Sequence, residues 1–182
     1  ITTVDIKVTN ILSIAAILLI IGICFKSFTI PFVLVASIEL AIFINQGIPS
    51  LFGTVIPFVS PIVIGCIQLG ATVDYAILMT TRFREEINNG YDRVQAIKIA
   101  ANASDKSIVT SALVFFCANV GVSAISRIEI IKSICTMLAR GAIISALVSM
   151  FILPSVLLAC EKMFRKTSRG WIFNKTSAKK KA

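Results

Sequence analysis

Residues 8–25 of the chain read VTNILSIAAILLIIGICF, a run of eighteen residues without a charged side chain. A helix of this length is enough to cross a hydrocarbon core of about 30 Å. A membrane-barrel strand would need a polar residue at every second position, and the segment shows no such alternation. Because the backbone in lipid must satisfy its own hydrogen bonds, the run predicts a membrane-spanning α-helix.

Four further apolar stretches of similar length follow, at residues 28–44, 57–81, 107–126 and 133–160. We therefore expect an all-α fold, in which residues 1–164 form a polytopic bundle of five transmembrane helices. Residues 165–182 are expected to form a basic cytoplasmic tail.

The one long connection, residues 82–106, is charged and contains the helix breaker Asn88-Asn89-Gly90. After this breaker, Val94, Ile97 and Ala101 fall on one helical face. This spacing predicts a short amphipathic helix at the membrane surface.

The composition excludes several classes of protein. The chain is 57% hydrophobic and only 15% charged, with a mean hydropathy of +0.91, which is incompatible with an ordinary soluble enzyme or a disordered chain. It has no histidine, so a Ser-His-Asp triad or a His-ligated zinc site cannot be built. The five cysteines match no metal-binding spacing and are interpreted as small buried apolar residues. We expect no enzymatic activity, cofactor or metal.

The net charge of +9 is concentrated after the last apolar run. A basic tail beside a membrane span marks the cytoplasmic side and contacts anionic lipid headgroups, and the aromatic-interleaved basic surface of a nucleic-acid-binding protein is missing. The distribution of Lys and Arg predicts an N-terminus outside and a C-terminus inside the cell. Since the chain starts at Ile1 without a start methionine, we expect it to be the C-terminal piece of a longer protein.

Asp74 is the most unusual residue, because it lies within the third apolar run. A carboxylate at the centre of a membrane helix costs about 2.5–3.5 kcal/mol on insertion scales. One interpretation is that Asp74 exchanges a proton and so carries it across the membrane. The alternatives are a fixed ion pair with Arg140 of the fifth run, or a position in the interface where Asp74 reaches water.

The neighbours of Asp74 suggest a polar track. Four residues are spaced to share the helical face beside it: Gln68, Thr72, Tyr75 and Met79. Tyr75 is suited to donate a hydrogen bond to a carboxylate on a facing helix, and the alternative is an interfacial anchor. Gly70, one turn before Asp74, would let a neighbouring helix approach closely.

Three other polar residues lie inside apolar runs. Glu39 is interpreted either as part of a substrate or ion path or as a structural group near the end of its span. Asn119 is predicted to bond between helices, with a site role as the alternative, and Arg140 is predicted to form a structural ion pair. Pro57 and Pro61 predict a kink or a loose first turn in the third helix. A second acid suitably placed for an intramembrane aspartyl protease is lacking.

Residues 69–78, LGATVDYAIL, resemble the Gly-x-x-x-Asp-Tyr signature of the MMPL family, within the resistance–nodulation–division (RND) transporter superfamily. The similarity covers about residues 5–164. It includes further segments in the same order: residues 25–28, 44–49, 107–113, 139–142 and 153–154.

The resemblance implies the last five of the six helices of one half of such a transporter, and the basic tail suggests the second half. It implies proton-driven export, or efflux by proton antiport, of hydrophobic or lipid-like molecules from a bacterial plasma membrane. Asp74 would be the proton carrier and Tyr75 its neighbour. The expected partners are membrane lipids, the lipid substrate, the missing N-terminal half and the external porter domains. A homo-oligomer and the identity of the substrate stay open.

Two alternatives to transport stay open at this stage. The first is a lipid- or sterol-sensing membrane module, which shares the helix arrangement of the superfamily but does not transport. The second is a scaffold that uses its helices only for packing. The complete Gly70-x-x-x-Asp74-Tyr75 motif favours proton coupling over both.

Overall fold

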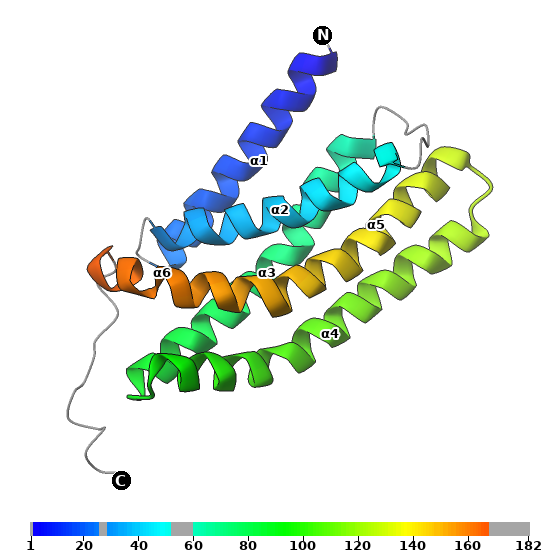
Figure 1. Ribbon diagram of the computed structural model, residues 1–182. Helices are drawn as coiled ribbons and strands as arrows, with labels where there is room; N and C mark the ends of the chain where they lie inside the picture. Colours follow the sequence, from blue (N-terminus) through cyan, green and yellow to red (C-terminus); the bar gives the residue numbers. More distant parts are fainter. Residues whose placement is uncertain (1, 26–28, 52–59, 168–182) are drawn as a thin grey trace.

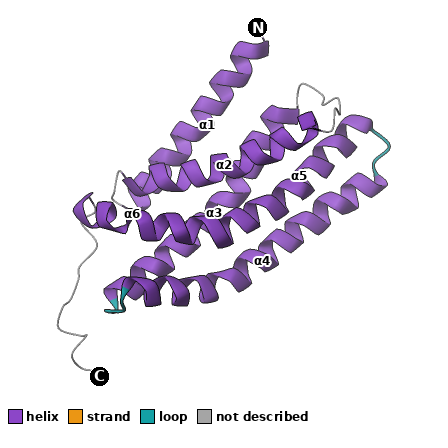
Figure 2. Ribbon diagram, viewed as in Figure 1, coloured by secondary structure: helices purple, strands orange, loops and turns teal. Residues whose placement is uncertain are grey.

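The computed structural model describes residues 2–25, 29–51 and 60–167, with side chains described for residues 8–25, 29–49 and 60–160. Its described elements are helical throughout (Figure 2). They are α1 (Thr2–Phe25), α2 (Thr29–Leu51), α3 (Ser60–Asn88), α4 (Arg93–Ile125), α5 (Glu129–Leu147), a π-helical turn η1 (Val148–Ile152) and α6 (Leu153–Thr167).

The helices form one bundle in which α5, η1 and α6 make a single bent rod (Figure 1). The helix α3 contacts α1, α2, α4 and the rod, so it occupies the middle of the bundle. The start of α1 and the end of α6 lie at opposite ends (Figure 1), as an odd number of crossings requires. Five of the described helical rods are long and apolar enough to cross a membrane. This confirms the predicted all-α fold with five membrane-spanning helices.

The two outer helices expose apolar side chains. Only 11% of the apolar windows of α1 and α4 is buried within the chain, against 50% for α2. Residues such as Ile11, Leu12 and Ile125 are largely exposed. Exposed apolar surface of this extent marks contact with lipid or with another protein.

The segment predicted as a separate surface helix has a different form. It is helical, but it is continuous with α4 and lengthens that helix by several turns. Its buried face consists of Ala96, Ile97 and Ala100, whereas Val94 is 51% exposed. This segment packs on the last turns of α3, where Phe83 belongs to the same buried cluster as Ile97 and Ala100.

Two prolines shape helix ends in different ways. Pro61 is the second residue of α3, where no backbone N–H is needed, so it starts the helix and does not kink it. Pro57 lies outside the described residues. Pro154 follows η1, where the N–H of Leu153 bonds to the carbonyl of Val148, five residues earlier. The widened turn relieves the clash that a proline ring makes with the carbonyl four residues before it.

The turn between α3 and α4 depends on Gly90. Its φ is +93°, a conformation that glycine adopts without steric cost. The N–H groups of Gly90 and Tyr91 donate to the carbonyls of Ile87 and Glu86, at 3.1 and 3.2 Å. This pair of bonds is a Schellman motif, which closes the end of α3.

We expect Gly90→Ala to destabilise the full-length protein by about 1 kcal/mol, because a Cβ is disfavoured in this conformation. Gly90→Asn should cost less, since asparagine tolerates positive φ. Thermal unfolding in detergent measures both. Equal stability of the alanine variant and the native protein would contradict the prediction.

Candidate functional site

Asp74 lies on the side of α3 that faces α4. Its side chain is exposed in this chain and lines a groove of about 810 Å³ between the two helices. Tyr75 and Leu78 of α3 line the same groove, and Ser107 and Phe115 are among its walls on α4. The groove therefore combines one carboxylate, a phenol and a few hydroxyl groups with largely apolar walls.

Neither the Asp74 carboxylate nor the Tyr75 hydroxyl has a hydrogen-bond or ion-pair partner within the described part of the chain. The alternative that Arg140 holds Asp74 in a fixed pair is wrong, since Arg140 bonds elsewhere. Asp74 is thus an acid without a partner in the described structure, on a helix long and apolar enough to span a membrane, and an acid in this setting is a candidate functional group.

The helical face predicted beside Asp74 is present. Gln68, Thr72, Tyr75 and Met79 are each at most 6% exposed. Gln68, Thr72 and Met79 turn toward the interior, while Tyr75, although buried, lines the groove to which Asp74 turns. The helix α3 therefore has one interior face and one face on the groove.

The interior face of α3 belongs to a polar network with α2 and α5. Asn45 Nδ2 donates to Gln68 Oε1 at 2.8 Å and to the Met137 carbonyl at 3.1 Å. Gln68 Nε2 donates to Ser145 Oγ at 2.9 Å and to the Gly141 carbonyl at 3.4 Å. Both amides are fully buried, so water cannot reach them. Their hydrogen bonds must therefore be made within the protein.

Arg140 completes this network at Asn45. Its Nε donates to Asn45 Oδ1 and its Nη2 to the Asn45 backbone carbonyl, both at 3.0 Å. That carbonyl would normally bond to the N–H four residues later, but this residue is Pro49, inside α2. Arg140 therefore supplies the donor that Pro49 lacks. The predicted ion pair of Arg140 was wrong for the described residues, since its partners are an amide and a carbonyl oxygen.

Glu39 lies in a different place from Asp74. It lines a cavity of about 160 Å³ with Asn10, Ser13 and Gln46, between α1, α2 and α3. The two acids do not share a site, and both interpretations of Glu39 stay open.

Two predictions about helix contacts were wrong within this chain. Asn119 Nδ2 donates to the Phe115 carbonyl of its own helix at 2.7 Å, while the polar link between α4 and α5 joins Ser123 Oγ and Thr136 Oγ1 at 2.9 Å. No described atom lies within 4 Å of the position that a Cβ on Gly70 would take. The close approach expected at Gly70 is found at Gly141 instead.

Sequence reasoning missed Asn45 and Ser145 as network members. The predicted second span ends at residue 44, one residue before Asn45, but α2 continues through Pro49 to Leu51. The available signal was the proline itself, because a helical proline leaves a carbonyl that a side chain on another helix must satisfy.

These features define a multi-pass helical membrane protein with a polar interior network and an open acidic groove. The MMPL family model matches residues 1–179, and the chain belongs to the MMPL family.

Several curated relatives agree with this assignment. The trehalose monomycolate exporter MmpL3 of Mycobacterium tuberculosis is 30% identical over 59% of this chain and 11% of its own length. The probable transport protein MmpL12 of the same species is 24% identical over 92% of this chain and 14% of its own length. The putative membrane protein YdgH of Bacillus subtilis is 29% identical over 65% of this chain. The chain thus corresponds to a small part of each relative.

We expect Gly141→Ala to destabilise the full-length protein by about 1–3 kcal/mol. A Cβ at this position would lie 2.6 Å from both Asn45 Nδ2 and Gln68 Oε1, so the two amides must separate and lose their hydrogen bond. Gly47→Ala in α2 is the matched control, since no described atom beyond the nearby backbone of its own helix lies within 4 Å of its added Cβ. Thermal unfolding in detergent compares the two, and equal effects would contradict the network.

A double-mutant cycle tests the link between Pro49 and Arg140. Arg140→Met should cost about 1.5–3 kcal/mol, the range for hydrogen bonds to a charged group. Pro49→Ala restores a backbone donor to the Asn45 carbonyl, so the same change should then cost less, with a coupling of about 0.5–1.5 kcal/mol. Lys132→Met, on the exposed start of α5, is the control for lost charge. Strictly additive costs would contradict the proposed replacement.

Proposed function

We propose that this chain is the C-terminal transmembrane part of a proton-driven exporter of hydrophobic or lipid-like molecules. The observation that carries the proposal is Asp74, an acid without a partner in the described structure, on a membrane-spanning helix and in a largely apolar groove. Membership of the MMPL family and the exporter and transport descriptions of MmpL3 and MmpL12 support it.

In this mechanism Asp74 alternates between an ionised and a protonated form. The ionised form is costly in apolar surroundings and draws water or a donor into the groove, whereas the neutral form lets the groove close. Since Asp74 has no partner among the described residues that fixes one form, protonation can shift the packing of α3 and α4 against a further helix bundle. Tyr75, beside it at the groove wall, would donate a hydrogen bond to the acid that faces it.

The transporting unit would be the longer protein. The chain spans only 11–14% of the length of the relatives reported above, so the N-terminal half and the external domains are proposed partners. We propose that the N-terminus lies outside and the C-terminus inside, because the basic residues gather at the C-terminal end.

Proton flux tests this proposal directly. The full-length parent is reconstituted in vesicles with a pH-sensitive dye inside, and a pH gradient is imposed. Asp74→Asn should reduce protein-dependent flux to the level of empty vesicles, because an amide cannot carry a proton. Glu129→Gln, the same chemical change on an exposed residue of α5, should leave the flux unchanged. Normal flux in Asp74→Asn would exclude Asp74 as the carrier.

Labelling with a hydrophobic carbodiimide gives a measurement that needs no substrate. The reagent attacks protonated carboxyl groups in apolar surroundings. Labelling of Asp74, read by mass spectrometry with Glu39 as an internal comparison, should increase as the pH is lowered. If Asp74 reacts only in the unfolded protein and at no pH in the membrane, the lipid-sensing module becomes the better interpretation.

A further inference from the structure

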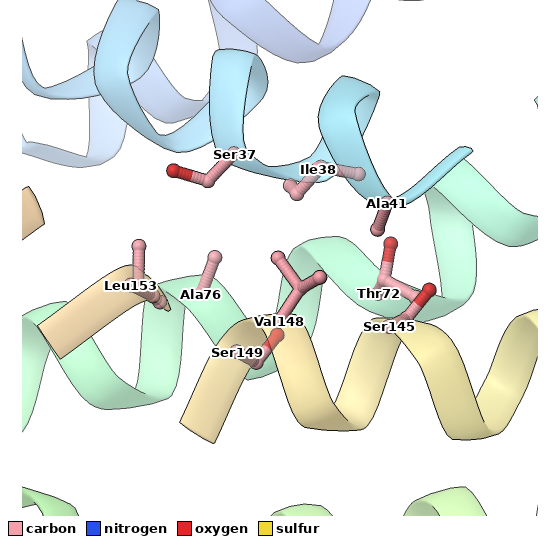
Figure 3. Close-up of a pocket in the computed structure, with 9 residues that line it drawn as sticks. All are labelled: Ser37, Ile38, Ala41, Thr72, Ala76, Ser145, Val148, Ser149 and Leu153. Carbon is pink, nitrogen blue, oxygen red and sulfur yellow. The ribbon is translucent and has the colours of Figure 1, made fainter. Parts of the chain in front are cut away.

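A small cavity lies on the other side of α3 from the Asp74 groove. Figure 3 shows it between α2, α3 and the bend of the α5–η1–α6 rod. Its volume is about 10 Å³, counted as the space open to the centre of a water molecule. This is enough room for about one water molecule. Its lining includes four hydroxyl-bearing residues: Ser37, Thr72, Ser145 and Ser149.

Three of these hydroxyl groups already form one hydrogen bond and can form another. Ser37 Oγ donates to the Val33 carbonyl at 3.0 Å, and Thr72 Oγ1 donates to the Gln68 carbonyl at 2.7 Å. Ser145 Oγ accepts from Gln68 Nε2 at 2.9 Å. A hydroxyl oxygen has two lone pairs and one proton, so Ser37 and Thr72 can still accept while Ser145 can still donate.

Ser149 is the exception in this set. Ser149 is only 5% exposed, and its hydroxyl has no hydrogen-bond partner among the described residues. Its oxygen is not one of the fully buried unpartnered side-chain atoms of the described residues, which are those of Ser60, Ser104 and Asp105, and it borders the cavity. A hydroxyl group beside a polar cavity usually bonds to ordered water.

The backbone at the same place also lacks a donor. The N–H of Leu153 is bonded to the Val148 carbonyl, and Pro154 has no N–H. The Ser149 carbonyl therefore receives no hydrogen bond from either Leu153 or Pro154, the residues of the next turn that could donate to it. Ser149 has both an unused hydroxyl and a carbonyl without a donor from the following turn.

We propose that this cavity is a binding site for a single water molecule, held by the hydroxyl groups of Ser149 and Ser145. The lining residues include no carboxylate, so a cation would lie there without a counter-charge, while water matches the mixture of donors and acceptors. Ser145 also belongs to the Arg140–Asn45–Gln68 network. The water therefore extends that network to the π-helical turn.

Radiolytic hydroxyl-radical footprinting of the full-length protein tests the site, because X-rays generate radicals from bound water inside a protein. Leu153 is 1% exposed and lines the cavity, whereas Leu157 is 0% exposed, one turn later, and does not line it. Oxidation of Leu153 should be several-fold faster than that of Leu157. Equal, slow oxidation of both leucines would show a dry cavity and overturn the proposal.

Two variants show whether Ser149 holds the water. Ser149→Ala should lower oxidation of Leu153 to the rate of Leu157. Ser155→Ala is the matched control, since Ser155 is exposed and its hydroxyl donates to the Phe151 carbonyl. Faster oxidation of Leu157 would show that the Ser149→Ala protein is unfolded. In that case Ser149→Thr, which retains the hydroxyl, takes its place and should keep the fast oxidation of Leu153. An unchanged rate at Leu153 in folded Ser149→Ala would overturn the assignment to Ser149.

The salt dependence separates water from a bound cation. Replacing sodium and potassium by choline should leave oxidation of Leu153 unchanged. A change in its rate would mean that a small cation occupies the cavity and would overturn the proposal of a water site.

Discussion

Polar groups inside a bilayer have no solvent to bond with, and this constraint explains how α2, α3 and α5 fit together. Pro49 leaves the Asn45 carbonyl without a helical donor, and Arg140 of α5 reaches across to supply one. The Asn45 amide then bonds to Gln68 of α3, and Gln68 bonds back to α5 at Ser145. In lipid, where apolar side chains gain little by leaving their surroundings, such bonds together with close packing set which helix faces meet.

The central helix α3 separates two kinds of chemistry. On its inner side Gln68 and Thr72 are buried and bonded, so this face holds the helix in one position. On its outer side Asp74 is exposed to the α4 groove without a bonded partner. In the proposed mechanism, the buried face fixes the position of the helix on which Asp74 gains and loses a proton.

The sequence predicts the existence of the helices better than their contacts. Run length and hydropathy predict five spans because crossing a fixed thickness needs a fixed number of apolar residues. They do not distinguish a helix face that meets protein from one that meets lipid, since both are apolar. For this reason the partners of Arg140 and Asn119 were predicted wrongly, and α2 was ended before Pro49. The Asp74 motif was recognisable because an acid in an apolar run stands out without knowledge of any contact.

The buried amides of the interior network have hydrogen-bond partners within the chain, whereas the acid in the groove has none in the described structure. The buried amides of Asn45 and Gln68 find hydrogen-bond partners within the chain. The Asp74 carboxylate has no such partner among the described residues, and only 11% of the apolar window of α4 is buried. If Asp74 had a fixed partner within its own bundle, protonation would have to break that bond before it could alter any packing. An acid whose partner lies outside the bundle couples its charge to the position of that partner, which is the property that a proton-driven conformational change requires.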